Sequence, residues 1–428
     1  MFQIKTSELK SVIRRLRAAH KPLLLIGTYG IGKSEMIFQD AKEESAETNR
    51  IFLDWNRSSL AEKQEAMLHP EKYYMFVDIR ISQLDEGDLR GIPVIANIQA
   101  QDKDAELKLV TLGWINYITK PGAAGTVFFD EINLARPSVT ATAYSIINDK
   151  VISDRAISPD VFIVAAGNKE EDCDLVQPIA APLMDRFAAA ELIFDSKFWL
   201  DWAASNINPH LYAFCNWKKD MLHVPAKAGT DDKAITPRGI YNASCLLNNT
   251  DFKNKNDVYS SVALCLGPAY ATQFRAYYDH VRALNWDTLS QNPESVEDMD
   301  TDKKFAVMGA AVARIKDSCS QESSNVGDLI EDCALPLTVI SYLSADFVMC
   351  VLKQLKDVIP VYNDKAKAAE EKLKINMGNI LAKLYLLGPK NFSGFKSFRK
   401  PVIDEMTKLQ KLFKDRHSKV FTTALTCK

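Results

Sequence analysis

A glycine-rich segment near the amino end constrains the fold of this 428-residue chain more than any other feature. Residues 27–34, GTYGIGKS, fit the pattern GxxxxGK followed by Ser or Thr, directly after the apolar run Leu23 to Ile26 and before a helical pattern. A loop in that setting turns backbone N–H groups inward around phosphate oxygens, whereas a chance glycine-rich turn would need neither flank. The predicted phosphate-binding residues are Gly27, Thr28, Tyr29, Gly30, Ile31, Gly32, Lys33 and Ser34.

Two of these residues have predicted roles with ATP and Mg²⁺. Lys33 is expected to reach the β- and γ-phosphates, and the Ser34 hydroxyl is expected to ligate Mg²⁺. Downstream, residues 126–131, TVFFDE, form an apolar run that ends in two carboxylates. Asp130 is predicted to hold the Mg²⁺ shell through water, and Glu131 to polarise the water that attacks the γ-phosphorus. Such a run is also common where a strand merely meets solvent, but its pairing with a phosphate loop favours the catalytic interpretation.

A third apolar run, Phe162 to Asn168 (FIVAAGN), is predicted to lie beside the strand that ends in Asp130. Its final amide could orient the attacking water, so Asn168 is a candidate catalytic residue. Asn168 could instead cap a turn. The tetrapeptide Asn168 to Glu171 also resembles the guanine-reading NKxD of GTPases, but its fourth residue is Glu and no other GTPase element is visible.

The pattern over the first two hundred residues alternates helical segments with short apolar strands, which is typical of a parallel sheet covered by helices. We therefore predict the α/β class, with a nucleotide-binding core over residues 1–195 and a five-stranded parallel sheet. Residues 1–20 are expected to form an amphipathic helix. The five expected strands are Leu23 to Ile26, Tyr73 to Val77, Val127 to Phe129, Phe162 to Ala165 and Leu192 to Phe194.

The rest of the chain is predicted to be helical, with a lid over residues 196–290 and a C-terminal module over residues 303–428. The acidic stretch Asn292 to Asp302 between them is expected to be a solvated linker rather than a helix start. Within the lid, the stripe Tyr270, Phe274, Tyr277 and Tyr278 is expected to be packed core rather than a base-stacking surface. The tail from residue 390 to 428 has ten Lys/Arg against three Asp/Glu, a net charge of +7.

Composition restricts the location and the partners. The net charge is −2, so no global positive field draws the chain to nucleic acid or to an anionic membrane. The first twenty residues lack the apolar core of a signal peptide, and the longest uncharged stretch, Val258 to Phe274, is too polar to span a membrane. Eight scattered cysteines form no zinc-like cluster. These features predict a cytoplasmic protein with reduced thiols and no membrane span.

The order of the motifs resembles the MoxR-like branch of AAA+ ATPases. The resemblance covers roughly residues 10–285 and is carried by the phosphate loop, VFFDEINLARPSVTATAYSIINDK, VISDRAISPDVFIVAAGNKEED and APLMDRF. The segment Asp78 to Pro93 is also similar to the region after that family's second strand, and Gly267 to Phe274 to a lid helix in some phage and bacterial members. The resemblance implies an AAA+ core with a helical lid and ATP hydrolysis with Mg²⁺.

The resemblance also implies further site residues and partners. Arg186 of the DRF motif would be the arginine finger that enters a neighbouring subunit's site, although an arginine capping a surface helix is the alternative. Arg238 of Thr236-Pro237-Arg238 would be the sensor 2 arginine of the lid. A shared site implies a homo-oligomeric ring, a hexamer by resemblance, which would remodel or mature a protein partner that carries a von Willebrand A domain. Residues between Ile95 and Gly125 correspond to a helix-2 insertion.

Two other functions compete with this interpretation. A nucleic-acid motor of restriction or phage-related systems would use the basic tail on phosphates, but a solvated helix face explains those charges equally well. A nucleotide-gated scaffold without hydrolysis would need neither Glu131 nor Arg186. The favoured prediction is an ATP-hydrolysing, MoxR-like chaperone.

Overall fold

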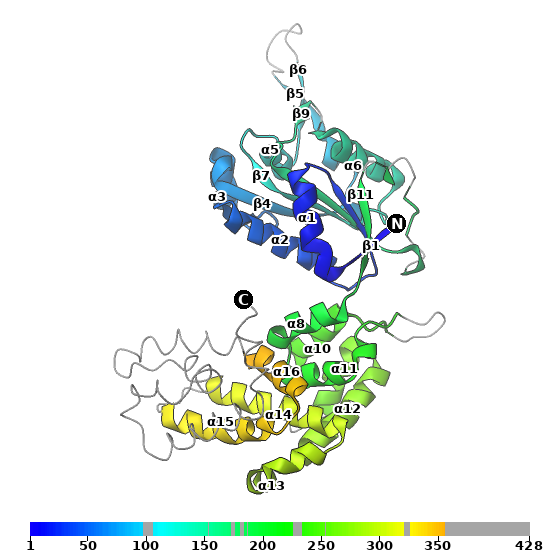
Figure 1. Cartoon of the computed structure of the whole chain (residues 1–428). Helices are drawn as coiled ribbons and strands as arrows, with labels where there is room; N and C mark the ends of the chain where they lie inside the picture. The colour runs from blue at the N-terminus through cyan, green and yellow to red at the C-terminus, as the bar shows by residue number, and fades with distance from the viewer. Residues whose placement is uncertain are drawn as a thin grey trace. The chain divides into compact units, whose positions relative to one another are not determined.

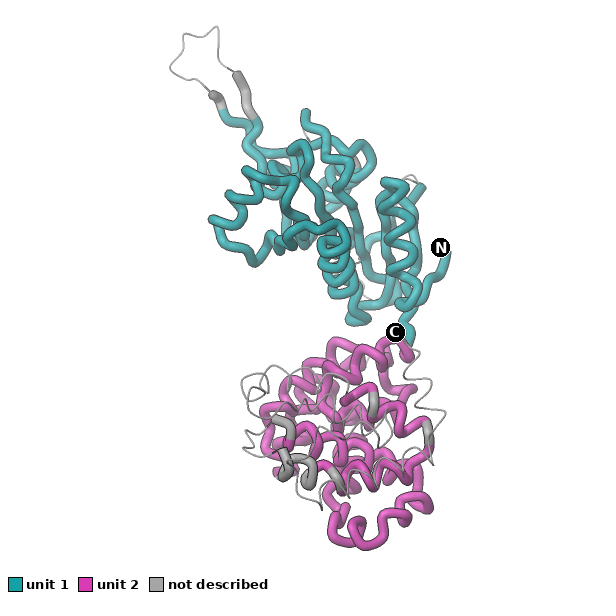
Figure 2. Tube along the Cα trace, turned by 60° about the vertical axis from the view of Figure 1, so that its left-hand side comes forward, with its two compact units in different colours: residues 1–195 teal, residues 196–428 magenta. Residues whose placement is uncertain are grey.

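The computed structural model describes residues 1–96, 106–152, 154–172, 176–179, 184–185, 187–225, 233–252, 254–320 and 326–355. The chain divides into two compact units, residues 1–195 and residues 196–428 (Figure 2). Arg186, residues 364–374 of the predicted helical C-terminal module and the basic tail, residues 390–428, lie outside the described residues.

The first unit is built on a seven-stranded sheet with the strand order β1-β11-β2-β10-β7-β4-β3 (Figure 1). Every neighbouring pair is parallel, so the carboxyl ends of all strands share one edge and their amino ends share the other. The strands are β1 (Phe2–Lys5), β2 (Leu23–Ile26), β3 (Ile51–Asp54), β4 (Tyr73–Arg80), β7 (Ala124–Asp130), β10 (Val161–Gly167) and β11 (Ala188–Ile193).

Helices cover both faces of this sheet, because successive side chains of a strand point to opposite faces. Tyr74 and Phe76 of β4 belong to a core that includes residues of α1 and α2. Met75 and Val77 belong to the core on the other face, which includes residues of α3, α5 and α6. The helices of this unit are α1 (Leu9–Ala18), α2 (Lys33–Glu47), α3 (Leu60–Leu68), α4 (Glu86–Arg90), α5 (Gly113–Ile118) and α6 (Pro137–Asp149), with 3-10 helices η1 (Thr6–Glu8), η2 (Pro70–Lys72), η3 (Ile81–Gln83) and η4 (Glu170–Asp172).

The α/β class with a parallel sheet and a helical C-terminal region is confirmed, but the predicted number of five strands is wrong. The two additional strands are β1 and β3, each four residues long and each at an edge of the sheet. The helix expected from the first residue begins only at Leu9, because Phe2–Lys5 pair in parallel with β11. The pairing partner of β1 is almost the length of the unit away in sequence, so no local pattern reveals it.

Two small antiparallel hairpins complete the first unit. One consists of β5 (Ile92–Ala96) and β6 (Glu106–Val110), within the predicted insertion region, and it projects from the rest of the unit (Figures 1 and 2). The other consists of β8 (Val151–Ile152) and β9 (Arg155–Ala156).

The second unit is helical in its described residues. Its helices are α8 (Ser196–Asn206), α9 (Pro209–Trp217), α10 (Pro237–Leu247), α11 (Lys255–Leu266), α12 (Pro268–Ala283), α13 (Trp286–Gln291), α14 (Thr301–Ser320), α15 (Val326–Ser341) and α16 (Ala345–Leu355), with 3-10 helices η5 (Lys219–Met221) and η6 (Pro293–Asp298). None of the helices in the described ranges has both the length and the apolarity needed to cross a bilayer.

Aromatic side chains fill the centre of the second unit. Tyr270, Phe274, Tyr277 and Tyr278 are all at most 7% exposed, which confirms the predicted packed stripe. Phe214 of α9 lies edge-on to Tyr270 and Phe274, a favourable geometry for aromatic pairs.

The acidic stretch between the predicted lid and C-terminal module is not a solvated linker over its whole length. Residues Pro293–Asp298 form η6, and Val296 within it is fully buried. Helix α14 then packs against α9 and α12, so described parts of both predicted segments share one compact unit. The lid and the C-terminal module as functional divisions stay predictions.

Candidate functional site

The phosphate-loop segment connects β2 to α2 at the carboxyl edge of the sheet. Gly30 has φ of 74° and Gly32 has φ of 93°, both in the left-handed region that glycine adopts without strain. Gly32 is also the N-cap residue of α2, so the loop ends where the helix leaves its first N–H groups unbonded within the helix. This backbone has the properties of an anion site at a helix N-terminus.

Lys33 is buried at 7% exposure, and its ammonium lies inside the loop. The ammonium donates to the carbonyl oxygens of Gly27 at 2.5 Å and Thr28 at 3.0 Å, and to Oδ1 of Asn168 at 3.1 Å. A buried cation inside a glycine-rich loop is well suited to attract the phosphate chain of a nucleotide. The contact also brings Asn168, predicted from a different strand, to the same site.

Ser34, in the first turn of α2, contacts Asp130, at the end of β7. The Ser34 hydroxyl donates to Oδ2 of Asp130 at 2.8 Å. A serine hydroxyl and a carboxylate are hard oxygen ligands of the kind that Mg²⁺ prefers. Their separation fits one cation held by Ser34, with Asp130 reaching it through water. The described residues contain no cluster of three or more His, Cys, Asp or Glu able to hold a metal, so such an ion would depend on substrate oxygens for its remaining ligands.

Glu131 follows Asp130 with φ of 56°, an uncommon left-handed conformation for a residue with a side chain. Two contacts maintain it. The backbone N–H of Glu131 donates to Oδ1 of Asp130 at 2.9 Å, and the Ser82 hydroxyl donates to Oε2 of Glu131 at 2.6 Å. Strained backbone of this kind concentrates at functional sites.

Asn133 fixes the backbone that carries Asn168. Its Nδ2 donates to the carbonyl oxygen of Asn168 at 2.7 Å, and its Oδ1 accepts from the Asn168 N–H at 3.1 Å. The preceding residue must be small, because a Cβ on Gly167 would lie 2.7 Å from Oδ1 of Asn133. Neighbouring Lys169 pairs with Glu191 at 2.5 Å, which argues against the guanine-reading alternative.

Asp78 adds a further acidic side chain beside the predicted magnesium residues. It lines a cavity of about 410 Å³ together with Ser34 and Asp54. Its Oδ1 is buried without a hydrogen-bond partner among the described residues. Burial, followed by the nearby Asp130, raises the pKa of Asp78 to about 6.

Arg186 and Arg238 are the two predicted site residues that this geometry does not include. Arg186 lies outside the described residues. Arg238 is exposed in the first turn of α10, where Thr236 caps the helix by accepting from the Gly239 N–H at 3.1 Å. It belongs to the second unit, so its role toward a nucleotide stays a prediction.

Sequence reasoning did not identify Ser82, Asn133 or Asp78 as site residues. Asp78 and Ser82 lie near the end of β4 and just beyond it, beside Asp130 on β7. The rule that parallel strands end at one edge could have indicated them, because β4 had been predicted. Asn133 had no such signal, since it acts through a loop contact to another strand.

Comparisons with known proteins leave the family open. No protein-family model matches the chain, and no curated protein matches it. Similar solved structures include PCH-2 of C. elegans, with 12% identity, a TM-score of 0.26, and coverage of 71% of this chain and 66% of that chain. The RuvB Holliday junction branch migration motor of Thermotoga maritima shares 13% identity, with a TM-score of 0.24 and coverage of 90% and 88%. The ORC2 protein of Aeropyrum pernix shares 11% identity, with a TM-score of 0.30 and coverage of 82% and 84%. TM-scores this low carry no argument, so the functional conclusion depends on the geometry of the site.

Proposed function

We propose that this chain is a Mg²⁺-dependent ATPase of the AAA+ class. The observation that carries the proposal is the convergence of four residues at one sheet edge: Lys33 and Ser34 at the start of α2, Asp130 at the end of β7 and Asn168 just after β10. The loop N–H groups and the Lys33 ammonium suit the phosphates of a nucleoside triphosphate, and the oxygens of Ser34 and Asp130 suit its metal ion. The motif resemblance narrows the class further, to a MoxR-like ring in which Arg186 of one subunit would complete the site of the next.

The roles of the residues follow from their contacts. The loop N–H groups and Lys33 bind and orient the phosphates, and bound Mg²⁺ would neutralise charge on the phosphate oxygens. Glu131 is the base that takes a proton from the attacking water, and Ser82 orients its carboxylate through the 2.6 Å hydrogen bond. Asn168 contacts Lys33 and can align the water with its amide.

A purely nucleotide-binding scaffold would need the cradle but not a base at its edge. The strained backbone of Glu131 and its hydrogen bond from Ser82 support hydrolysis, because both orient a carboxylate that binding alone does not use. We propose that hydrolysis drives remodelling of a protein partner, with a von Willebrand A domain protein as the candidate. The nucleic-acid alternative depended on the basic tail, and no contact within the described ranges favours it.

The Glu131→Gln variant tests this proposal, because the amide keeps the shape of the side chain and loses the base. We expect ATP affinity close to wild type and a turnover lower by about 10²–10⁴-fold, measured by phosphate release. Exposed Glu71, on η2 before the amino end of β4, provides the matched control, and Glu71→Gln should hydrolyse ATP normally. Wild-type turnover in Glu131→Gln would exclude hydrolysis through this residue. Native mass spectrometry of the same variant with ATP tests the ring, and its co-purification from the host tests the partner.

A further inference from the structure

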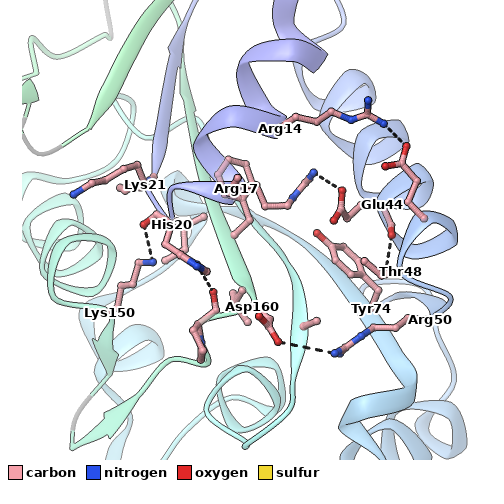
Figure 3. A pocket seen from close by; sticks show the side chains of 18 residues that line it. Arg14, Arg17, His20, Lys21, Glu44, Thr48, Arg50, Tyr74, Lys150 and Asp160 are labelled. Atoms are coloured by element: carbon pink, nitrogen blue, oxygen red, sulfur yellow. Dashed lines mark hydrogen bonds and ion pairs between the residues drawn. The ribbon is translucent and has the colours of Figure 1, made fainter.

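A second cavity lies at the opposite edge of the same sheet, at the amino ends of β2, β4, β7 and β10 (Figure 3). Its volume is about 610 Å³, within the range of small-molecule sites. No residue of the phosphate loop or of the carboxylate pair contributes to its lining. The cavity is therefore separate from the proposed ATPase site.

Positive charge predominates around this cavity. Its lining includes Arg14, Arg17, Lys21, Arg50 and Lys150, against the carboxylates of Glu44, Glu47 and Asp160. Arg14 pairs with Glu47, and Arg17 pairs with Glu44 and with Asp40 behind the lining. Arg50 lies 4.0 Å from Asp160 and donates to the carbonyl of Gly122 at 3.0 Å. The lining cations that form no ion pair among the described residues are therefore Lys21 and Lys150.

Two of the lining residues occupy backbone positions where glycine would be less strained. His20, just after α1, has φ of 52°, and Lys150, at the end of α6, has φ of 49°. Helices commonly end in this conformation, and glycine usually supplies it because it has no Cβ. The Lys150 ammonium donates to the backbone carbonyl of His20 at 2.9 Å, and Nδ1 of His20 lies 3.0 Å from the Pro159 carbonyl oxygen (Figure 3).

The polar groups of the cavity include donors without acceptors. Nε of Arg17 is buried and has no hydrogen-bond partner among the described residues. The Lys21 ammonium likewise makes no hydrogen bond or ion pair within the described ranges. Burial and then the neighbouring charge of Lys21 lower the pKa of Lys150. Two cations close together, with no carboxylate bonded to either, would be stabilised by an anion.

Apolar surface lies next to these cations. Ala18 and Pro159 of the lining supply this surface, whereas Tyr74 and Phe162 are only 2% and 4% exposed and the Arg17 guanidinium lies over the ring of Phe162, 5.1 Å from its centroid. We propose that this cavity binds a small phosphate monoester, with the phosphate at Lys21 and Lys150 and the organic group against Ala18 and Pro159. Inorganic phosphate alone would leave the apolar surface and most of the volume unused.

The test uses AMP and inorganic phosphate as ligands of the full-length Lys33→Ala protein, in which the phosphate loop is disabled. Calorimetry at constant ionic strength should show AMP binding more tightly than inorganic phosphate. Adding Lys150→Gly should weaken AMP binding at least about tenfold, because a charge-assisted contact is lost. Glycine suits this backbone position, so Lys150→Gly should unfold at a temperature equal to or above that of its parent.

Asn49→Gly is the matched control, because Asn49 has φ of 54° after α2 and does not line the cavity. This variant should bind AMP as its parent does. Lys21→Gln provides a second removal of charge at an exposed position and should also weaken AMP binding. The proposal is overturned if AMP does not bind, if it binds no better than inorganic phosphate, or if Lys150→Gly and Lys21→Gln bind as tightly as Asn49→Gly.

Discussion

Replacing Asp78 by Asn should stabilise the protein at neutral and alkaline pH, although it removes a residue beside the proposed active site. The carboxylate lies among Asp130, Asp54 and Glu131, and the positive charge of Arg80 partly offsets theirs. Its Oδ1 is buried without a hydrogen-bond partner among the described residues. The backbone of Asp78 is anchored independently, because its N–H donates to the Asn56 side chain at 2.9 Å and its carbonyl accepts from the same amide at 3.0 Å.

The magnitude follows from the pKa of Asp78, which folding raises from 3.8 to about 6. A rise of about two pH units corresponds to about 3 kcal/mol. Solvent screens this half-buried group, so we expect a gain of about 1–2 kcal/mol in the free energy of unfolding. Below about pH 4 both states are protonated and the ionisation of Asp78 has no effect. The penalty develops between about pH 4 and 6 and is complete above, so the gain in Asp78→Asn should grow over that interval.

The assay is urea unfolding of the full-length protein at pH 4.5 and pH 8, with peptide-resolved hydrogen exchange to assign the transition to the first unit. The Glu71→Gln variant is the control, because substitution of an exposed carboxylate should change stability by less than about 0.5 kcal/mol. Equal stability of wild type and Asp78→Asn at pH 8 would refute the reasoning. So would a gain that is larger at pH 4.5 than at pH 8.

Two further predictions concern Ser82, which contacts Glu131, and Gly125, which lies close to Met75 of the neighbouring strand. Ser82→Ala should lower ATP turnover about three- to tenfold with little change in ATP affinity, because Glu131 loses the donor that orients it. Ser82→Thr, which keeps the hydroxyl, should retain turnover. Equal rates of steady-state phosphate release by wild type and Ser82→Ala would contradict that role. Gly125→Ala should destabilise the protein by about 2 kcal/mol or more in urea unfolding, because its Cβ would lie 2.3 Å from the carbonyl oxygen of Met75. Gly87→Ala, where a Cβ meets nothing within 4 Å, should be neutral or stabilising, and similar losses in both variants would contradict the steric explanation.

The sequence could predict the parts of the site that consist of contiguous residues or that lie at the ends of long strands. Residues 27–34 determine the loop by themselves, because the glycines, the lysine and the helix start are contiguous. Asp130 and Asn168 could be predicted because each ends a long buried strand, and neighbouring parallel strands end at one edge. The structure brings Asn168 to Lys33 and Asp130 to Ser34, although no single window of sequence contains either pair.

The missed strands and site residues have a common cause. The strands β1 and β3 are short, and the exposed side chains of Phe2 and Ile51 break the buried pattern that identifies a central strand. They exist because β11 and β4 offer open edges for pairing, which is a tertiary effect. Asn133 was missed for the same reason, since its hydrogen bonds to Asn168 join segments that only the fold brings together.

The parallel sheet also relates the two sites to each other. It places residues that precede the strands at one edge and residues that end them at the other. Asp54 and Asp130 end β3 and β7, whereas Lys21 and Arg50 lie just before β2 and β3. Like charges repel each other until a ligand of opposite sign binds, so Asp54 and Asp130 favour a cation beside the phosphates that Lys33 would bind, whereas Lys21 favours an anion. Flanking charges alone do not decide the ligand, because Arg80 ends β4 at the carboxyl edge and Asp160 precedes β10 at the amino edge. The ligand of each site depends on which of these charges the fold leaves without a partner.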